Sequence, residues 1–243
     1  MSWNRLSFHF KQTHAGGYRY LDRCGEFMVE AVEKFRFIPG EIKVTGARLE
    51  IPEEVITADA DPQGLSLTQE FPKDDGTLFL SLAEGLAKLT SEFFTPKAVM
   101  TRGLAVKSYW PMKSEEAVLK ASLNLGDSYH IQLGKSVGMV PSRKNIDLNF
   151  TSGSLDFHVM VHPVSFEKVS VQRFNPGFDV TPEHKERLAR LNRKADRIDL
   201  KSPYAIMMEL DLIESDPPVE LLAKHFDQLK KQEAILMEEL VIK

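Results

Sequence analysis

The sequence lacks the features that define several large classes of protein. Cys24 is the single cysteine among 243 residues, which excludes an intramolecular disulfide and an all-cysteine metal site. No apolar run approaches the roughly 18–20 residues that a membrane-spanning helix needs, and the first residues lack the apolar core of a signal peptide. These absences favour a reducing compartment, and we expect a cytoplasmic protein with no membrane contact.

Strong charge of one sign is also missing. The formal net charge is −4 and the pI about 6.0, so the chain as a whole lacks the basic character of many nucleic-acid-binding proteins. The charge is uneven, however. Residues 1–96 carry 10 Lys and Arg against 15 Asp and Glu, whereas residues 97–243 carry 21 against 20. Any basic surface is therefore expected in the second half.

Familiar catalytic signatures are absent as well. Gly134-Lys135-Ser136 resembles the end of a phosphate-binding loop, but Tyr129 stands where the first glycine of that motif belongs. No Gly-x-Ser-x-Gly sequence occurs, and Cys24 falls on the apolar stripe of a predicted helix, as an inert core thiol does. We therefore lean toward a protein that is not an enzyme, with no cofactor and no metal site.

The sequence does contain strong strand and helix patterns. Alternating apolar residues, as in Leu6, Phe8 and Phe10, predict strands through most of the chain. Residues 41–51 look like one strand with a bend at Gly46. Apolar residues spaced by three and four predict helices over residues 22–36, 78–94, 182–198 and 217–240. The pattern indicates an α+β fold, in which a curved antiparallel sheet is covered by helices.

The last of these helices has a clear start. Asp216 is a good cap residue, and Pro217 suits the first helical position, so we expect a long amphipathic helix from about Pro217 to Leu240. Residues 65–94 and residues 204–240 share one order of predicted elements, in which a strand is followed by an acidic turn and then by a helix. A duplicated sheet-plus-helix unit, divided into residues 1–96 and 97–243, would explain this similarity. One compact domain is the alternative.

The C-terminal segment resembles a known family. The acidic strand Glu209-Leu210-Asp211 leads into a helix that carries Leu222, Phe226 and Leu229, and Arg19-Tyr20-Leu21-Asp22-Arg23 adds to the likeness. In these features residues 204–242 resemble a sporadically distributed, uncharacterised family of bacterial proteins. The resemblance implies an α+β fold and a bacterial origin. It implies no activity and no catalytic residue.

His130, Asp156 and His158 are the candidates for catalysis. His158 and His162 share one face of a predicted strand but lie roughly 13 Å apart along it, too far to bind one metal ion. Asp156 and His158 are closer, at about 6–7 Å. They could form an acid–base pair with His130 from a neighbouring strand. Polar groups on the solvent side of a sheet explain all three more simply.

The predicted helix over residues 182–198 is unusually basic. Five basic residues recur there mostly at intervals of three or four: Arg187, Arg190, Arg193, Lys194 and Arg197. The resulting ridge would suit a phosphate backbone or an acidic partner. Acidic neighbours dilute it, so a solvated helix face is the simpler interpretation.

The terminal helix offers a second contact surface. Leu222, Leu229 and Leu236 are spaced by seven residues, and Phe226 extends the stripe. Such a stripe is typical of a coiled-coil dimer or, more often, of a helix that covers its own sheet. Glu233 interrupts the apolar pattern.

Three hypotheses for the function follow. The first is a non-enzymatic binding or accessory component of a bacterial intracellular complex. The second is an RNA- or DNA-associated protein, such as a processing nuclease built from duplicated ferredoxin-like units. The third is a chaperone-like or ligand-binding protein with an apolar groove under the last helix.

Overall fold

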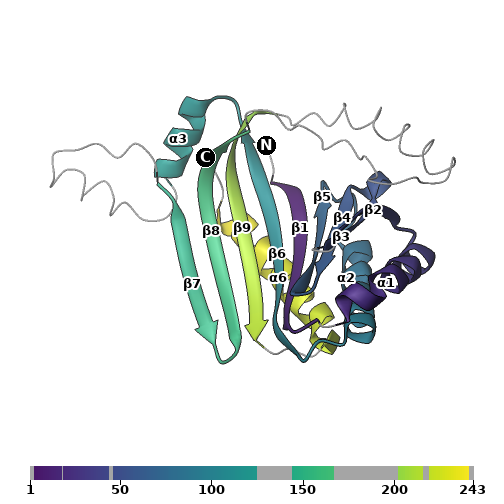
Figure 1. Cartoon of the computed structure of the whole chain (residues 1–243). Helices are drawn as coiled ribbons and strands as arrows, with labels where there is room; N and C mark the ends of the chain where they lie inside the picture. Colours follow the sequence, from purple (N-terminus) through teal and green to yellow (C-terminus); the bar gives the residue numbers. More distant parts are fainter. Residues whose placement is uncertain are drawn as a thin grey trace.

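One antiparallel sheet runs through the whole molecule (Figure 1). The computed structural model describes residues 3–17, 19–43, 46–124, 144–166, 202–215 and 219–240. The strands are β1 (Asn4–Ala15), β2 (Ile38–Lys43), β3 (Gly46–Ile51), β4 (Ile56–Asp61), β5 (Gly64–Glu70), β6 (Ala98–Met112), β7 (Ile146–Ser152), β8 (Leu155–Ser165) and β9 (Tyr204–Ser215). Their order is β2-β3-β4-β5-β1-β6-β9-β8-β7.

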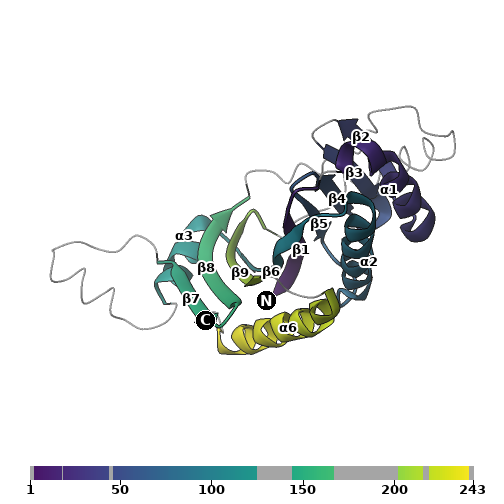
Figure 2. The ribbon, with the colours of Figure 1, turned by 60° about the horizontal axis from the view of Figure 1, so that its bottom comes forward.

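Three of the four helices in the described part of the chain cover one face of this sheet (Figure 2). The helices are α1 (Tyr20–Phe35), α2 (Thr77–Phe94), α3 (Glu115–Leu123) and α6 (Leu222–Glu239), and the short 3-10 turns are η1 (Pro52–Glu54) and η2 (Val219–Leu221). Helices α1 and α2 pack side by side over the β2–β5 half, whereas α6 lies across β6 and β9. Helix α3 packs against β6, β8 and β9, and the hydroxyl of Ser114 caps its first turn.

The core lies between the sheet and these helices. Phe8 and Phe10 point from β1 into it, because side chains alternate along a strand. The Phe8 ring packs against Phe79 of α2 and Phe226 of α6, with ring centroids 5.4 and 5.1 Å away. All three rings are fully buried. This aromatic cluster joins the middle of the sheet to the two long helices.

The two central strands, β1 and β6, join the two ends of the sheet. Strands β2–β5 extend the sheet outward from β1, and strands β7–β9 extend it outward from β6 in the opposite direction. The rings of Trp3 and Trp110 meet edge to face across this seam, 5.7 Å apart. The sheet is therefore continuous from one edge to the other.

The main features of the predicted fold are confirmed, and some details are wrong. Helix and strand are mixed, the sheet is large and antiparallel, and a long helix ends the chain. The single strand predicted over residues 41–51 is in fact a hairpin of β2 and β3, in which Lys43 pairs with Gly46. Strand β4 was not predicted, because the small side chains of Ala58 and Ala60 weaken its apolar alternation.

The terminal helix begins later than the sequence indicates. The 3-10 turn over Val219–Leu221 precedes α6, and Asp216 and Pro217 lie outside the described residues. Nor do those residues include the strand predicted around residues 129–133 or the basic helix over residues 182–198. No helix in the described ranges is both long enough and apolar enough to cross a membrane.

Candidate functional site

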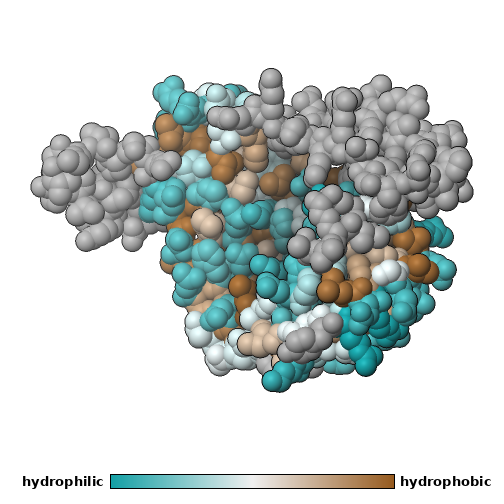
Figure 3. Space-filling view, in the orientation of Figure 1, coloured by the Kyte–Doolittle hydropathy of each residue, from teal (hydrophilic) through white to brown (hydrophobic). Residues whose placement is uncertain are grey.

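The face of the sheet opposite α1, α2 and α6, which we call the polar face, carries a row of titratable side chains. The register of the strands puts His158 opposite Asp211 and Asp211 opposite Ala105. Ala105 in turn stands opposite His9. Hydrophilic residues gather over the part formed by β7, β8 and β9 (Figure 3). The row thus crosses the centre of the sheet and reaches its exposed end.

His158 joins three strands through two carboxylates. Its Nε2 atom lies 2.8 Å from Oδ1 of Asp147 on β7, and its Nδ1 atom lies 3.3 Å from Oδ2 of Asp211 on β9. The hydrogen bond to Asp147, assisted by that to Asp211, raises the pKa of His158. A ring that donates from both nitrogens is an imidazolium, and it has no lone pair with which to accept a proton. This geometry suits a clamp between strands better than a general base.

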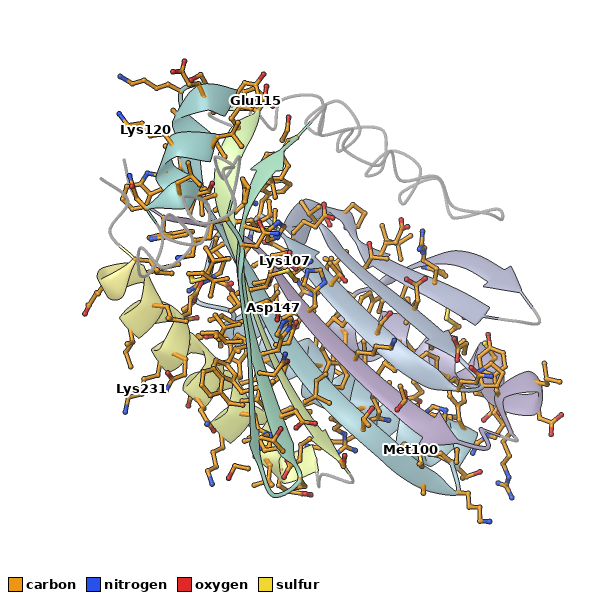
Figure 4. The ribbon with its side chains drawn as sticks, turned by 90° about the vertical axis from the view of Figure 1, so that its left-hand side faces the viewer. Met100, Lys107, Glu115, Lys120, Asp147 and Lys231 are labelled. Carbon is orange, nitrogen blue, oxygen red and sulfur yellow. The ribbon has the colours of Figure 1, made fainter. Side chains whose placement is uncertain are left out.

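Lys107, Glu209 and His162 form a second group of ionic contacts. Lys107 Nζ lies 2.5 Å from Oε2 of Glu209, and His162 Nε2 lies 2.9 Å from the other carboxylate oxygen. The hydrogen bond from His162 and the contact with Lys107 lower the pKa of Glu209 to about 2. Lys107 of β6 and Asp147 of the edge strand β7 lie between α3 and Met100 along the length of the strands (Figure 4).

His9 is held neutral on the same face. Its Nε2 atom lies 2.7 Å from the hydroxyl of Ser7, and its Nδ1 atom lies 3.2 Å from that of Thr68. Burial, and then the nearby charge of Lys107, lower the pKa of His9 to about 4. The polar face thus holds one histidine with a lowered pKa at its centre and one with a raised pKa near its edge.

The described residues do not form a metal centre. Across those ranges, no group of three or more His, Cys, Asp or Glu side chains is placed to hold a metal ion. His158 and His162 bond to different carboxylates, in line with their wide spacing along β8.

A hollow of about 310 Å³ opens beside His158 at the exposed end of the sheet. It is lined by Asn149, Phe150, Thr151, Asp156, His158, Asp211 and Ile213. Asp156 accepts a hydrogen bond from the hydroxyl of Thr151, at 2.8 Å, while His158 bonds to Asp147 and Asp211. The carboxylates and the imidazole around the hollow therefore already have partners within the protein.

An apolar groove lies on the other side of the same strands, beside α6. It measures about 330 Å³ and is lined by Phe150, Thr151, Ser152, Leu155, Phe157, Gln228 and Gln232. Leu148 is 48% exposed and Phe150 54% exposed on this side of β7. We call the patch of Leu148, Phe150, Leu155, Phe157, Gln228 and Gln232 the β7 surface.

Two of the three sequence-predicted catalytic residues, Asp156 and His158, lie in the part of the chain that the structure describes. Asp156 and His158 share the polar face of β8, but Asp147 and Asp211 supply the carboxylates that bond to His158. His130 lies outside the described residues, as do Arg187, Arg190, Arg193, Lys194 and Arg197. Cys24 is buried, and burial raises the pKa of its thiol, as expected for an unreactive side chain.

The apolar stripe of α6 faces the protein's own sheet. Leu222, Phe226 and Leu229 are buried there, and Leu236 packs against the same core. A dimer interface through these four side chains would therefore require α6 to leave the sheet. Glu233 interrupts the stripe because it reaches Arg5 and Ser108, both at 2.5 Å.

Sequence reasoning missed most members of the polar-face network. Asp147, Glu209 and Asp211 occupy the polar positions of predicted strands, which is a signal that they share a face. Their partners depend on which strands are neighbours, and local alternation does not reveal that order. The pairing of β8 with both β7 and β9 was the missing information.

Comparison of the chain with protein-family models gives no match. A search of curated proteins gives no match either. The family resemblance of residues 204–242 therefore remains a prediction, and the functional argument rests on the geometry.

Proposed function

We propose that the protein is a non-enzymatic binding component of a larger assembly, and that the β7 surface contacts its partner. The observation that carries this proposal is the exposure of Leu148 and Phe150, at 48% and 54%, next to the groove beside α6. Contiguous apolar groups exposed on a folded protein commonly mark interaction sites. The exposed apolar side chains of the β7 surface therefore form a candidate contact site at the β7 end of the sheet.

The state of the polar face supports a role without catalysis. A catalytic base needs an unprotonated nitrogen or a free carboxylate within reach of a substrate. The ring nitrogens of His158 both contact carboxylates, and Glu209 is held between Lys107 and His162. These side chains are engaged in joining strands, which explains their presence without a reaction.

We place this component in the cytoplasm of a bacterium. The resemblance of residues 204–242 to a bacterial family supports the origin. The lone Cys24, buried in the core, supports a reducing compartment.

We further infer that the chain is a duplication of one unit, with copies in residues 1–96 and 97–243. Strand β1 pairs with β5, after which α2 follows, just as β6 pairs with β9, after which α6 follows. β1 and β6 pair antiparallel, as two units related by a two-fold axis would do. Equivalent helix positions are buried: Phe79 and Leu222, Leu86 and Leu229, Thr90 and Glu233.

The nucleic-acid hypothesis has less support. Its basic ridge over Arg187–Arg197 lies outside the described residues. Around His158, the polar face presents the carboxylates of Asp147, Asp156 and Asp211. Carboxylates repel a phosphate backbone, so this part of the sheet is unsuited to RNA or DNA.

A peptide-display selection tests the proposed function. The native chain is used to select from a library of random extended peptides, and each enriched peptide is then measured against a Leu148→Lys/Phe150→Lys variant. We expect enriched peptides to bind the native chain and to lose most of their affinity for this variant. If the enriched peptides bind both proteins equally, the proposal is wrong.

The control variant is Leu21→Lys/Val29→Lys on α1. It replaces two apolar side chains that are also exposed, at 66% and 55%, but lie far along the sheet from β7. We expect this control to bind the enriched peptides as the native chain does. Circular dichroism shows that each variant is folded before the comparison is made.

A further inference from the structure

The two edges of the sheet differ in their protection against another strand. The β2 edge carries Pro39, which has no N–H to donate, and the register of β2 with β3 shifts between Pro39 and Ile42. Prolines and irregularities of this kind block the addition of further strands. The β2 edge is thus closed to pairing.

The β7 edge has none of these devices. Strand β7 has the sequence IDLNFTS, without proline or lysine, and pairs with β8 in an unbroken register over all of its residues. Within the described part of the chain, β8 is its only neighbour. A regular edge strand leaves a row of N–H and C=O groups ready to pair.

The side chains of β7 are complementary to those of a second β7. In an antiparallel pair centred on Asn149, Leu148 of one copy stands opposite Phe150 of the other, and Asp147 stands opposite Thr151. Apolar groups then meet on one face and hydrogen-bonding groups on the other. Asp147 is the one charged residue of β7, and the two copies of it would lie roughly 13 Å apart along the strands.

This pairing also extends the groove beside α6. A two-fold axis perpendicular to the sheet keeps the helix-covered faces of both copies on the same side. Leu148 and Phe150 of each copy would then cover each other, next to the Gln228 and Gln232 side chains of both α6 helices. The exposed apolar area of one molecule is thus matched by an equal area of the same shape.

We propose that β7 of one molecule pairs antiparallel with β7 of a second copy, giving a two-fold dimer with one continuous sheet. This inference rests on the proposed function, because it names the partner of the same surface. It also explains why the β2 edge is protected and the β7 edge is not. A closed dimer uses one edge and must prevent growth at the other.

Sedimentation equilibrium over a series of concentrations tests the inference. We expect the native chain to dimerise, and we expect Phe150→Lys to raise the dimer dissociation constant by about tenfold or more, because the buried aromatic contact would be lost in both copies. Val29→Lys on α1 is the matched control and should dimerise as the native chain does.

A cysteine cross-link tests the register. Asn149→Cys should form a covalent dimer on mild oxidation, because the two copies of residue 149 face each other across the axis. Lys231→Cys, on the exposed side of α6 (Figure 4), should not. Cys24 is buried and is unchanged in both proteins.

The outcomes separate the two proposals. A native chain that is monomeric at all concentrations overturns the second copy as partner, and so does a dimer that Phe150→Lys leaves intact. If the monomer still binds selected peptides through Leu148 and Phe150, the proposed function stands with another protein as partner. If neither dimer nor peptide binding is found, both proposals are wrong.

Discussion

His9 and His158 lie on the same face of the sheet, yet their surroundings shift their pKa values in opposite directions. Burial lowers the pKa of His9 to about 4, whereas the carboxylate of Asp147 raises that of His158. The folded protein thus favours the neutral form of the first ring and the protonated form of the second. The difference arises from the neighbours that each ring meets across the strands.

The shift at His9 makes the protein sensitive to acid. An unfolded histidine takes up a proton near pH 6.5, but the folded protein keeps His9 neutral down to about pH 4. Its contribution to stability is therefore present above pH 6.5 and is lost as the pH falls toward 4. We expect His9→Asn to reduce the loss of unfolding free energy between about pH 7 and about pH 5 by on the order of 1–2 kcal/mol.

Urea unfolding at both pH values measures this effect. Burial also lowers the pKa of His14, so part of the acid sensitivity should persist in the variant. Equal losses in the native chain and in His9→Asn would show that His9 is not held neutral. His158 contributes with the opposite sign, because its raised pKa stabilises the folded protein at lower pH.

Single residues of the site could be recognised from the sequence as polar positions in strands, but their partners could not. Asp156 and His158 were correctly placed on one face of a strand, whereas the contacts of His158 with Asp147 and Asp211 depend on strand order. Glu233 shows the same limit. Its place in an apolar stripe is explained by Arg5 and Ser108, which are 228 and 125 residues away in the chain.

At the scale of elements, the periodic helices were the most predictable. The stripes of α2 and α6 bury the residues that their spacing indicates, because one face of each helix meets the sheet. On α1, Leu21 is 66% exposed, and Tyr20 takes the buried position at the start of the helix. The hairpin of β2 and β3 was missed because the change in apolar alternation at Gly46 was interpreted as a bend within one strand.

The start of α2 depends on a glycine. Gly76 has a φ of +91°, and a Cβ atom there would lie 2.4 Å from the Phe226 ring and 2.9 Å from the Phe8 ring. We expect Gly76→Ala to lower the free energy of unfolding by roughly 2–4 kcal/mol, because backbone strain adds to overpacking. Thermal or urea unfolding measures the change.

Gly25→Ala is the matched control for this substitution. Gly25 lies inside α1, and a Cβ atom there would meet nothing within 4 Å. Alanine is the better helix former, so we expect a gain of about 0.5–1 kcal/mol. An equal effect of the two substitutions would mean that the contact of Gly76 with the aromatic cluster is unimportant for stability.

At the scale of the whole molecule, the seam between β1 and β6 decides whether the two halves act as one. Both strands pair over most of their length, and Phe8 contacts helices from both halves. We expect a single cooperative unfolding transition. Tryptophan fluorescence reports on the seam through Trp3 and Trp110, and circular dichroism reports on all elements.

The two signals should change at the same urea concentration. A fluorescence change that precedes the loss of circular dichroism would show that the seam opens first and that residues 1–96 and 97–243 are separate domains. The sequence predicted an antiparallel sheet but not which strands join its two ends, because pairing between β1 and β6 spans about ninety residues of chain.

The place of β1 in the centre of the sheet also bears on how the chain folds as it leaves the ribosome. Strands β2–β5 and helix α2 emerge before β6, so the first half can assemble with one side of β1 bare. The next strand to emerge is β6, which pairs with this bare side of β1. An aggregation-prone edge therefore lasts only for the synthesis of a short further stretch of chain.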